Sequence, residues 1–191
     1  MFKNEPTLTK LKYNFFKSPK KDFARALSSL EFFQENKVYV IELKDGAYQK
    51  DYCVNDVCES YSKYEGMLQT FLDARHGLKI EGFENFNRNI FQFTNTLSNV
   101  WERPVDCHAY WGFEGHGSFN THTDSCNVVI AVVQGKKLVE VKGVEYNLSR
   151  GDILYIPPNV PHKATNITDC LSLSFGSFDY DETVKGFLET L

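Results

Sequence analysis

The stretch GDILYIPPNVPHKATN, residues 151–166, decides the fold and holds the most constrained histidine of the chain. Gly151-Asp152 predicts a turn, and the ILYIP that follows has the β-branched and aromatic composition of a strand. Three prolines then fix a rigid corner before His162, because proline locks its own φ angle. A side chain presented so rigidly is preorganised, as a metal ligand must be.

A second stretch, NTHTDSC (residues 120–126), places His122 and Asp124 one residue apart. In a β-strand, positions i and i+2 point to the same face, so we expect the imidazole and the carboxylate side by side. Burial of such a pair is unfavourable unless something binds it. The two residues are therefore either a hydrogen-bonded pair at a solvated edge or two ligands of a metal site.

His162 is the candidate for a third ligand. A loop histidine taken alone is more often hydrogen-bonded than metal-bound, but His122 and Asp124 belong to the same predicted β-region. Two imidazoles and one carboxylate suit Fe(II) and leave three coordination positions open for substrate and oxygen. We therefore interpret His122, Asp124 and His162 as metal ligands.

The chain from Val105 onward is a series of short apolar or alternating runs separated by Gly, Asn and Pro. About seven such strands predict an antiparallel sandwich or barrel. The runs are VDCHAYWGF, THTD, NVVIAVV, KKLVEV, VEYNL, ILYIPP and CLSLSFGSF.

The first hundred residues predict mostly helices. Residues 18–36 have Ser18 as a plausible N-cap and proline at the first helical position. Helices are also expected near 56–75 and 86–100, and a strand over 37–43. The residues expected to face the core are Phe23, Leu27, Leu30, Phe33, Val57, Tyr61, Tyr64, Leu68, Phe71, Leu72, Phe86, Ile90, Phe93 and Leu97.

These elements indicate one domain over residues 1–191, in which a largely helical part (1–103) packs on a β-core (104–178). The tail, 179–191, predicts a short closing helix. With 42% hydrophobic and 15% aromatic residues, the composition is that of a globular protein and excludes a disordered chain.

Charge and cysteine usage favour a cytoplasmic protein. The formal net charge is −4 and no Lys/Arg run exceeds two residues, so no nucleic-acid footprint is expected. The N-terminus lacks the apolar region of a signal peptide, and the longest apolar run, residues 128–133, is too short for a membrane span. Five widely spaced cysteines, an odd number, indicate reduced thiols.

Residues 151–166 resemble the second motif of the cupin superfamily. That motif has a Gly, then a Pro, the metal-binding His and an Asn, which here are Gly151, Pro157, His162 and Asn166. One departure is Asn159, where cupins usually carry Gly, and Asn is the next most suitable residue for a left-handed turn. The resemblance implies a double-stranded β-helix, the cupin jelly roll.

The first motif is similar to that of the JmjC-like branch, the Fe(II)- and 2-oxoglutarate-dependent oxygenases. Metal-binding cupins usually have His-x-His followed by Glu, whereas this chain has His122-x-Asp124 and valines where the Glu would fall. Ribosomal oxygenases and the asparaginyl hydroxylase of hypoxia signalling have a Gly thirteen residues after the first His and a basic residue fifteen after it. Gly135 and Lys137 occupy those offsets. Residues 104–111 and 170–176 also resemble the flanking strands of the ribosomal-oxygenase (cupin 4-like) group.

This resemblance implies roles for further residues. Lys137 would bind the far carboxylate of 2-oxoglutarate, whereas a lysine after a hairpin is otherwise solvated. Tyr110, His108 and Ser174 would line the cosubstrate pocket, although such residues inside a β-sandwich more often serve packing. His108 replaces the Asn usual in the relatives. The implied activity is a dioxygenase that hydroxylates a C–H bond, using Fe(II), 2-oxoglutarate and O2.

Two other readings stay open at this point: a metal cupin that uses no keto-acid, such as a dioxygenase or isomerase, and a ligand-binding cupin without catalysis. The primary substrate is unknown; a protein or peptide side chain leads by family analogy, and a small molecule follows closely. Ribosomal oxygenases carry dimerisation and winged-helix regions after the β-domain, which we expect this chain to lack; a homodimer is left open.

Overall fold

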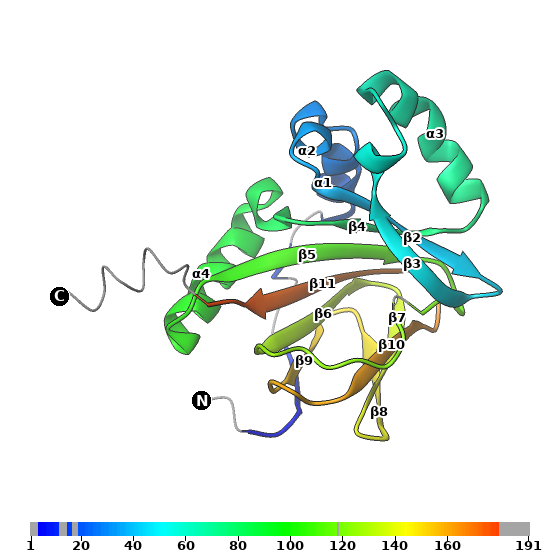
Figure 1. The fold of residues 1–191 in the computed structure, drawn as a ribbon. Coiled ribbons are helices and arrows are strands. Elements are labelled where there is room, and N and C mark those ends of the chain that lie inside the picture. The colour runs from blue at the N-terminus through cyan, green and yellow to red at the C-terminus, as the bar shows by residue number, and fades with distance from the viewer. Residues whose placement is uncertain (1–3, 12–14, 17–18, 118, 180–191) are drawn as a thin grey trace.

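The computed structural model describes residues 4–11, 15–16, 19–117 and 119–179. Its strands form an eight-stranded sheet in the order β1-β9-β6-β11-β5-β4-β2-β3 and a three-stranded sheet in the order β10-β7-β8 (Figure 1). The strands are β1 (Thr7–Lys10), β2 (Val38–Lys44), β3 (Ala47–Cys53), β4 (Gly77–Ile80), β5 (Val105–Gly112), β6 (Val128–Gln134), β7 (Lys136–Val141), β8 (Val144–Ser149), β9 (Asp152–Ile156), β10 (His162–Asn166) and β11 (Cys170–Ser177). The helices are α1 (Pro19–Leu27), α2 (Leu30–Gln34), α3 (Tyr61–Asp73) and α4 (Arg88–Trp101), with 3-10 turns at Val54–Asp56 and Phe83–Phe86.

The C-terminal strands form the expected double-stranded β-helix, so the fold is mainly β. The strand pairs of the described residues are all antiparallel, and the small sheet packs against β6 and β9 of the large one. An apolar cluster joins the two sheets at one end of the barrel. Its members are Val128, Ile130, Val132, Val139, Val141, Leu148, Leu154, Ile156, Val160 and Cys170.

Strand β6 is buried on both faces, which explains its unbroken apolar sequence VVIAVV. Val128, Ile130 and Val132 pack into the cluster between the sheets. The alternate residues, such as Val129 and Ala131, belong to a second cluster on the outer face of the large sheet. The large sheet is therefore the middle layer of the molecule.

The four helices cover that outer face (Figure 1). Ala26 of α1 and Ile90 of α4 are fully buried in the outer cluster. Asn87 links the two helices: its Oδ1 accepts the backbone N–H groups of Asn89 and Ile90, and its Nδ2 donates to Asp22 Oδ2 at 2.7 Å. One buried amide thus caps α4 and fixes α1 beside it.

The first hundred residues contain more strand than expected. Strands β1, β3 and β4 were not predicted, and β3 pairs with the predicted strand β2. The two-residue connection Asp45-Gly46 has φ angles of 51° and 78°, as a type I′ hairpin requires. The Asp-Gly pair therefore ends β2 and turns the chain back into β3.

The expected helix over 18–36 is two helices, because Ser29 ends the first region and N-caps α2 through its Oγ. Leu30 follows that break and is 49% exposed, so its predicted core position is wrong. Val57 is 50% exposed for a similar reason: α3 begins only at Tyr61, and Val57 lies in the turn before it.

Two expectations fall outside the described residues, namely the N-cap at Ser18 and, apart from Asp179, the short helix over 179–191. Within the described part of the chain, no helix has the length and hydropathy that crossing a membrane requires.

Candidate metal centre

His122 and Asp124 lie in the loop between β5 and β6, not on a strand as the i, i+2 spacing predicted. His122 forms an isolated bridge with His162 at the start of β10. The His122 N–H donates to the His162 carbonyl at 3.0 Å, and the His162 N–H donates to the His122 carbonyl at 2.9 Å. A single cross-strand pair, rather than one continuous strand, brings the candidate ligands together.

The proline corner before His162 is tied to the same loop. Asn159 adopts the left-handed conformation with φ of 59°, as its place in the cupin-like motif predicted. Its N–H donates to the carbonyl of Asp124 at 2.6 Å. The side chain of His162 is 5% exposed, so this corner delivers a buried imidazole.

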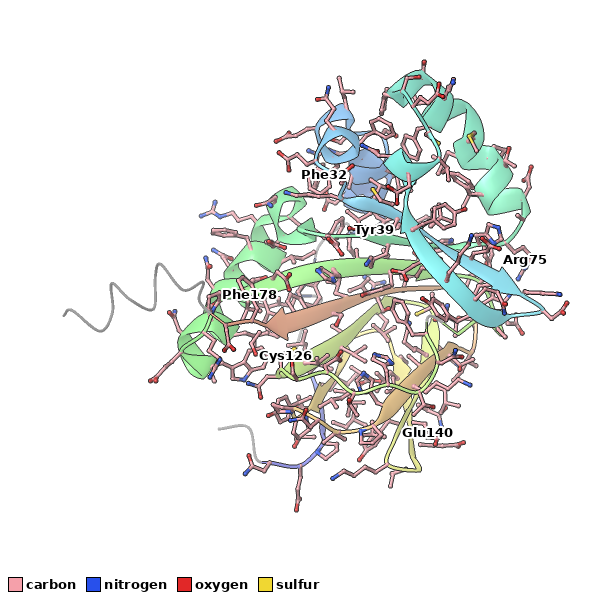
Figure 2. All side chains as sticks on the ribbon, in the orientation of Figure 1. Phe32, Tyr39, Arg75, Cys126, Glu140 and Phe178 are labelled. Atoms are coloured by element: carbon pink, nitrogen blue, oxygen red, sulfur yellow. The ribbon has the colours of Figure 1, made fainter. Side chains whose placement is uncertain are left out.

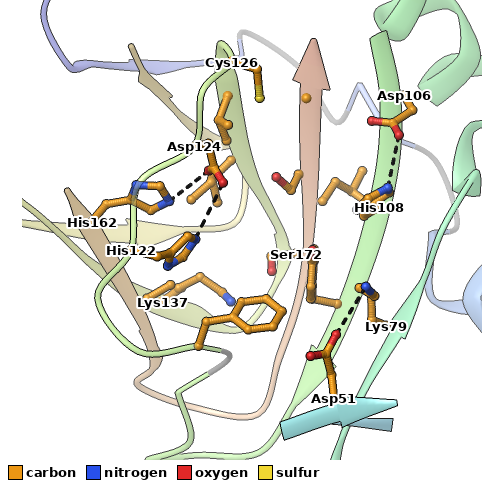
Figure 3. A pocket seen from close by; sticks show the side chains of 18 of the residues that line it. Asp51, Lys79, Asp106, His108, His122, Asp124, Cys126, Lys137, His162 and Ser172 are labelled. Atoms are coloured by element: carbon orange, nitrogen blue, oxygen red, sulfur yellow. Dashed lines mark hydrogen bonds and ion pairs between the residues drawn. The ribbon is translucent and has the colours of Figure 1, made fainter. Parts of the chain in front are cut away.

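The ligand atoms of His122, Asp124 and His162 all lie within 4.8 Å of one another. Asp124 Oδ2 is 3.4 Å from His162 Nε2, and Asp124 Oδ1 is 3.9 Å from His122 Nε2 (Figure 3). Each Nδ1 donates to a backbone carbonyl, that of Asn120 at 2.8 Å and that of Val160 at 3.0 Å. Carbonyls only accept, so in the neutral imidazoles both Nε2 atoms keep a lone pair for a metal. The donor set fits a divalent ion such as Fe(II).

These three residues border a cavity of about 780 Å³ between the two sheets. Its floor is formed by Ser172, Ser174 and Gly176, which alternate along β11 with residues of the outer core. Small side chains at these positions leave the space open. Strand residues, and not only the loop that carries His122 and Asp124, therefore form the wall of the cavity.

Lys137 lies in this cavity and is only 3% exposed. Strand β7 alternates, so Lys136 points to solvent while Lys137 points into the barrel with Val139. Among the described residues, Lys137 forms no ion pair with a carboxylate. Burial lowers the pKa of its ammonium group, although the nearby Cys170 acts in the opposite direction. A buried ammonium is unfavourable unless an opposite charge or hydrogen-bond acceptors compensate its lost hydration.

The other predicted cosubstrate residues also line the cavity. Tyr110 and His108 lie on the inner face of β5, opposite Ser172 and Ser174 of β11. Burial raises the pKa of Tyr110 well above its usual range, so this phenol is a neutral hydrogen-bonding group. His108 Nε2 is 3.1 Å from Asp106 Oδ2.

Sequence reasoning missed several lining residues. Asp106 and Ser172 could have been found, since each lies two residues from a predicted lining residue on the same strand. Asp51 and Lys79 belong to β3 and β4, which were not predicted, and Phe119 lies in the ligand loop. Their place at the cavity depends on strand pairing between distant segments.

The five cysteines form no disulfide. Cys126, in the segment just before β6, is half-buried and lines the cavity, as does Phe178 just after β11 (Figure 2). Burial, and then the charge of Asp124, raise the pKa of its thiol. Cys126 is therefore a neutral thiol in the cavity wall.

Comparisons with known proteins agree with this architecture. Residues 109–175 match the model of the cupin domain. No curated protein matches the sequence. Among solved structures, the ribosomal oxygenase YcfD of Escherichia coli aligns over 97% of this chain with a TM-score of 0.65 and 20% identity.

Two further YcfD structures align with this chain equally well. The structure in complex with cobalt and 2-oxoglutarate has a TM-score of 0.65 and 19% sequence identity to this chain. The other has a TM-score of 0.67 and 18% sequence identity. Each alignment again covers 97% of this chain. This chain spans about half the length of the YcfD structures, 51–52% of which is covered. At such identities the likeness establishes the fold. Residues 109–175 are therefore similar to a cupin domain, and the chain as a whole shares the fold of the corresponding half of the YcfD structures.

Proposed function

We propose that this protein is an Fe(II)- and 2-oxoglutarate-dependent oxygenase. The observation that carries the proposal is the presence, in one cavity, of a two-histidine, one-carboxylate set and a buried lysine without a carboxylate partner among the described residues. The likeness to a ribosomal oxygenase that was solved with cobalt and 2-oxoglutarate supports it.

In this proposal His122, Asp124 and His162 hold the metal, and Lys137 binds the far carboxylate of the cosubstrate by a charge-assisted hydrogen bond. When bound, the metal and the keto-acid supply the oxidising chemistry that turns a C–H bond into an alcohol. Tyr110 and Ser174 line the space between, where they orient the cosubstrate. The apolar cluster at the closed end of the barrel excludes water from behind Lys137.

The primary substrate is a protein or peptide side chain or a small molecule. The name of the similar structures, ribosomal oxygenase, favours a protein substrate. The cavity of about 780 Å³ is large enough for a substrate group in addition to the cosubstrate.

The test is an anaerobic titration of the apo-protein with Fe(II) and then 2-oxoglutarate, following the weak visible charge-transfer band of the chelate. We expect a band in the wild type, no band in Asp124→Ala and a band in Lys137→Ala only at much higher 2-oxoglutarate. Fe(II) binding without a band would instead favour a metal cupin of another class. A protein that binds no metal would be a ligand-binding cupin.

A further inference from the structure

The wall of the cavity opposite the metal ligands is lined with charged side chains. Figure 3 shows His122, Asp124 and Lys137 on one side of the cavity, with His108 and Asp106 facing them from β5. Lys79 and Asp51 lie further along the same wall. This polar wall is distinct from the three metal ligands and from the lysine proposed to hold the cosubstrate.

The Asp106–His108 pair presents hydrogen-bond acceptors. His108 Nε2 lies 3.1 Å from Asp106 Oδ2, and a carboxylate only accepts, so Nε2 carries the hydrogen. The Nδ1 atom of the neutral imidazole is then an acceptor, and so is the second oxygen of Asp106. Within the described chain neither atom receives a hydrogen bond from another residue. Both side chains are partly exposed to the cavity.

The positive charge of Lys79 is already paired with carboxylates, so it does not favour the binding of an anion at this wall. Its Nζ lies 2.9 Å from Glu81 Oε1, 3.5 Å from Asp51 Oδ2 and 3.9 Å from the ring centre of Tyr39. Two carboxylates and an aromatic face already surround this ammonium. Among the lining residues, Lys79, Asp51 and Asp106 give the wall one positive and two negative charges, and Glu81, which pairs with Lys79 from outside the lining, adds a third negative charge.

The other half of the cavity is balanced by its own ligands. A divalent metal and Lys137 would carry three positive charges, against three negative charges from Asp124 and the doubly charged cosubstrate. The excess negative charge of the opposite wall is therefore left for the remaining ligand, the primary substrate. Such an excess disfavours the binding of carboxylates and phosphates at this wall.

Building on the proposed function, we propose that the Asp106–His108 pair binds the primary substrate rather than the cosubstrate. The pair selects a nitrogen group that donates hydrogen bonds, such as an amine or an amide, and rejects anions. His108 is thus a specificity residue, and its replacement of the Asn found in relatives changes substrate choice without weakening 2-oxoglutarate binding.

The test uses three probes of equal length: n-butylamine, butyramide and butyrate. Protein loaded with Mn(II) and saturated with 2-oxoglutarate, so that the metal and Lys137 are already occupied, is titrated with each probe, and the paramagnetic line broadening of the probe is measured by NMR. We expect the amine and the amide to bind and butyrate not to bind. Asp106→Asn keeps an acceptor for His108 but removes a charge, so it should weaken the amine about tenfold more than the amide.

His108→Gln should weaken both nitrogen probes about tenfold and leave the 2-oxoglutarate dissociation constant within about twofold. Glu140→Gln, which removes the same charge from an outward position of β7, should change nothing (Figure 2). Thermal melting of each variant verifies that it is folded.

Two results would overturn the inference: butyrate binding as well as butylamine, or a tenfold loss of 2-oxoglutarate affinity in His108→Gln. The second would assign His108 to the cosubstrate pocket. Failure of the proposed function is a separate result, in which wild type forms no 2-oxoglutarate chelate at all. The comparison of butylamine with butyramide in wild type and Asp106→Asn, which involves no anionic probe, then still decides whether the Asp106–His108 pair selects nitrogen donors.

Discussion

Lys136 and Lys137 are neighbours in the sequence, but only the second is positioned to bind a ligand inside the barrel. Lys136 is exposed on β7, whereas Lys137 is buried opposite Leu148 and Asn166 in the strands on either side. Strand alternation therefore separates two chemically identical residues into a solvated one and a buried one. Substitution of each lysine in turn therefore compares a buried ammonium with an exposed one at neighbouring positions of the same strand.

Lys137→Ala is expected to weaken 2-oxoglutarate binding by roughly 10- to 100-fold, because a hydrogen bond to a charged group contributes about 1.5–3 kcal/mol. The measurement is the dissociation constant from the anaerobic chelate band. Lys136→Ala should leave that constant unchanged. Equal losses in both variants would show that general surface charge, not the buried ammonium, attracts the cosubstrate.

Glu84, in the 3-10 turn Phe83–Phe86, is a partly buried carboxyl group that continues the hydrogen bonding along the edge of β5. Its Oε2 accepts the backbone N–H of Cys107 at 3.0 Å, beyond the point where β4 ends its pairing with β5. Burial raises the pKa of Glu84 above its usual value, and the charge of Asp106 adds to this. The fold therefore favours the neutral form of this side chain.

Glu84→Gln is expected to raise the melting temperature at pH 7, because it keeps an acceptor for Cys107 and removes a buried charge. The raised pKa means that the wild type loses stability as pH rises through that pKa, so the two proteins should converge near pH 4. Glu84→Ala, which leaves the Cys107 N–H unpaired, should be less stable than both. Melting curves from pH 4 to pH 8 measure this; parallel curves for wild type and Glu84→Gln would contradict it.

At the scale of elements, the turn between β6 and β7 sets where Lys137 lies. Gly135 has φ of 79°, and a Cβ atom there would overlap the carbonyl oxygen of Asp169 and crowd Thr168 Oγ1. Gly143, between β7 and β8, has φ of 78°, and a Cβ atom there would have no neighbouring atom within 4 Å. The two glycines share a backbone conformation and differ only in their surroundings.

Gly143→Ala should lower the free energy of unfolding by about 1–2 kcal/mol, the penalty of a left-handed alanine. Gly135→Ala should lose a further 1–3 kcal/mol, roughly, from steric overlap, and should also weaken 2-oxoglutarate binding through displacement of Lys137. Urea denaturation and the chelate titration measure the two effects. Equal destabilisation by both substitutions would mean that the contact with Asp169 is easily relieved.

Individual elements show what the sequence could and could not predict. The proline corner and the strand that ends before it are local features, and local chemistry predicted them, whereas the interest of Gly135 and Lys137 came from the resemblance to known oxygenases. Strand β4, four residues long, carries no such signal, because it is stabilised by pairing with β2 and β5. The loop that carries Asp124 was read as a strand, since alternation alone cannot distinguish a strand from a loop held by one bridge.

At the scale of the whole molecule, a metal would join the loop before β6 to the corner before β10. A metal that binds only the folded state at a hundredfold excess over its dissociation constant stabilises by about 2.7 kcal/mol. For a chain of this length we expect the melting temperature to rise by roughly 5–10 °C. Differential scanning fluorimetry with and without Mn(II) measures this, and Asp124→Ala should abolish the shift.

The overall jelly roll was predicted from residues 104–178, whereas the completed cavity was not. The cavity wall opposite the metal ligands takes Asp51 and Lys79 from strands far from the cupin-like motifs in the sequence. Only the order of strands in the large sheet, with β4, β2 and β3 added beside β5, brings them there. Long-range pairing of this kind leaves no periodic trace in a single sequence.

The backbone bridge between His122 and His162 has a consequence for metal supply. Because the two loops hold each other, the coordination sphere is assembled before any ion arrives, and removing the ion with a chelator should inhibit the protein without denaturing it. A preassembled cup of two imidazoles and a carboxylate also accepts several first-row ions. In the proposed oxygenase, occupation of the site by an ion other than Fe(II) would therefore inhibit the activity reversibly.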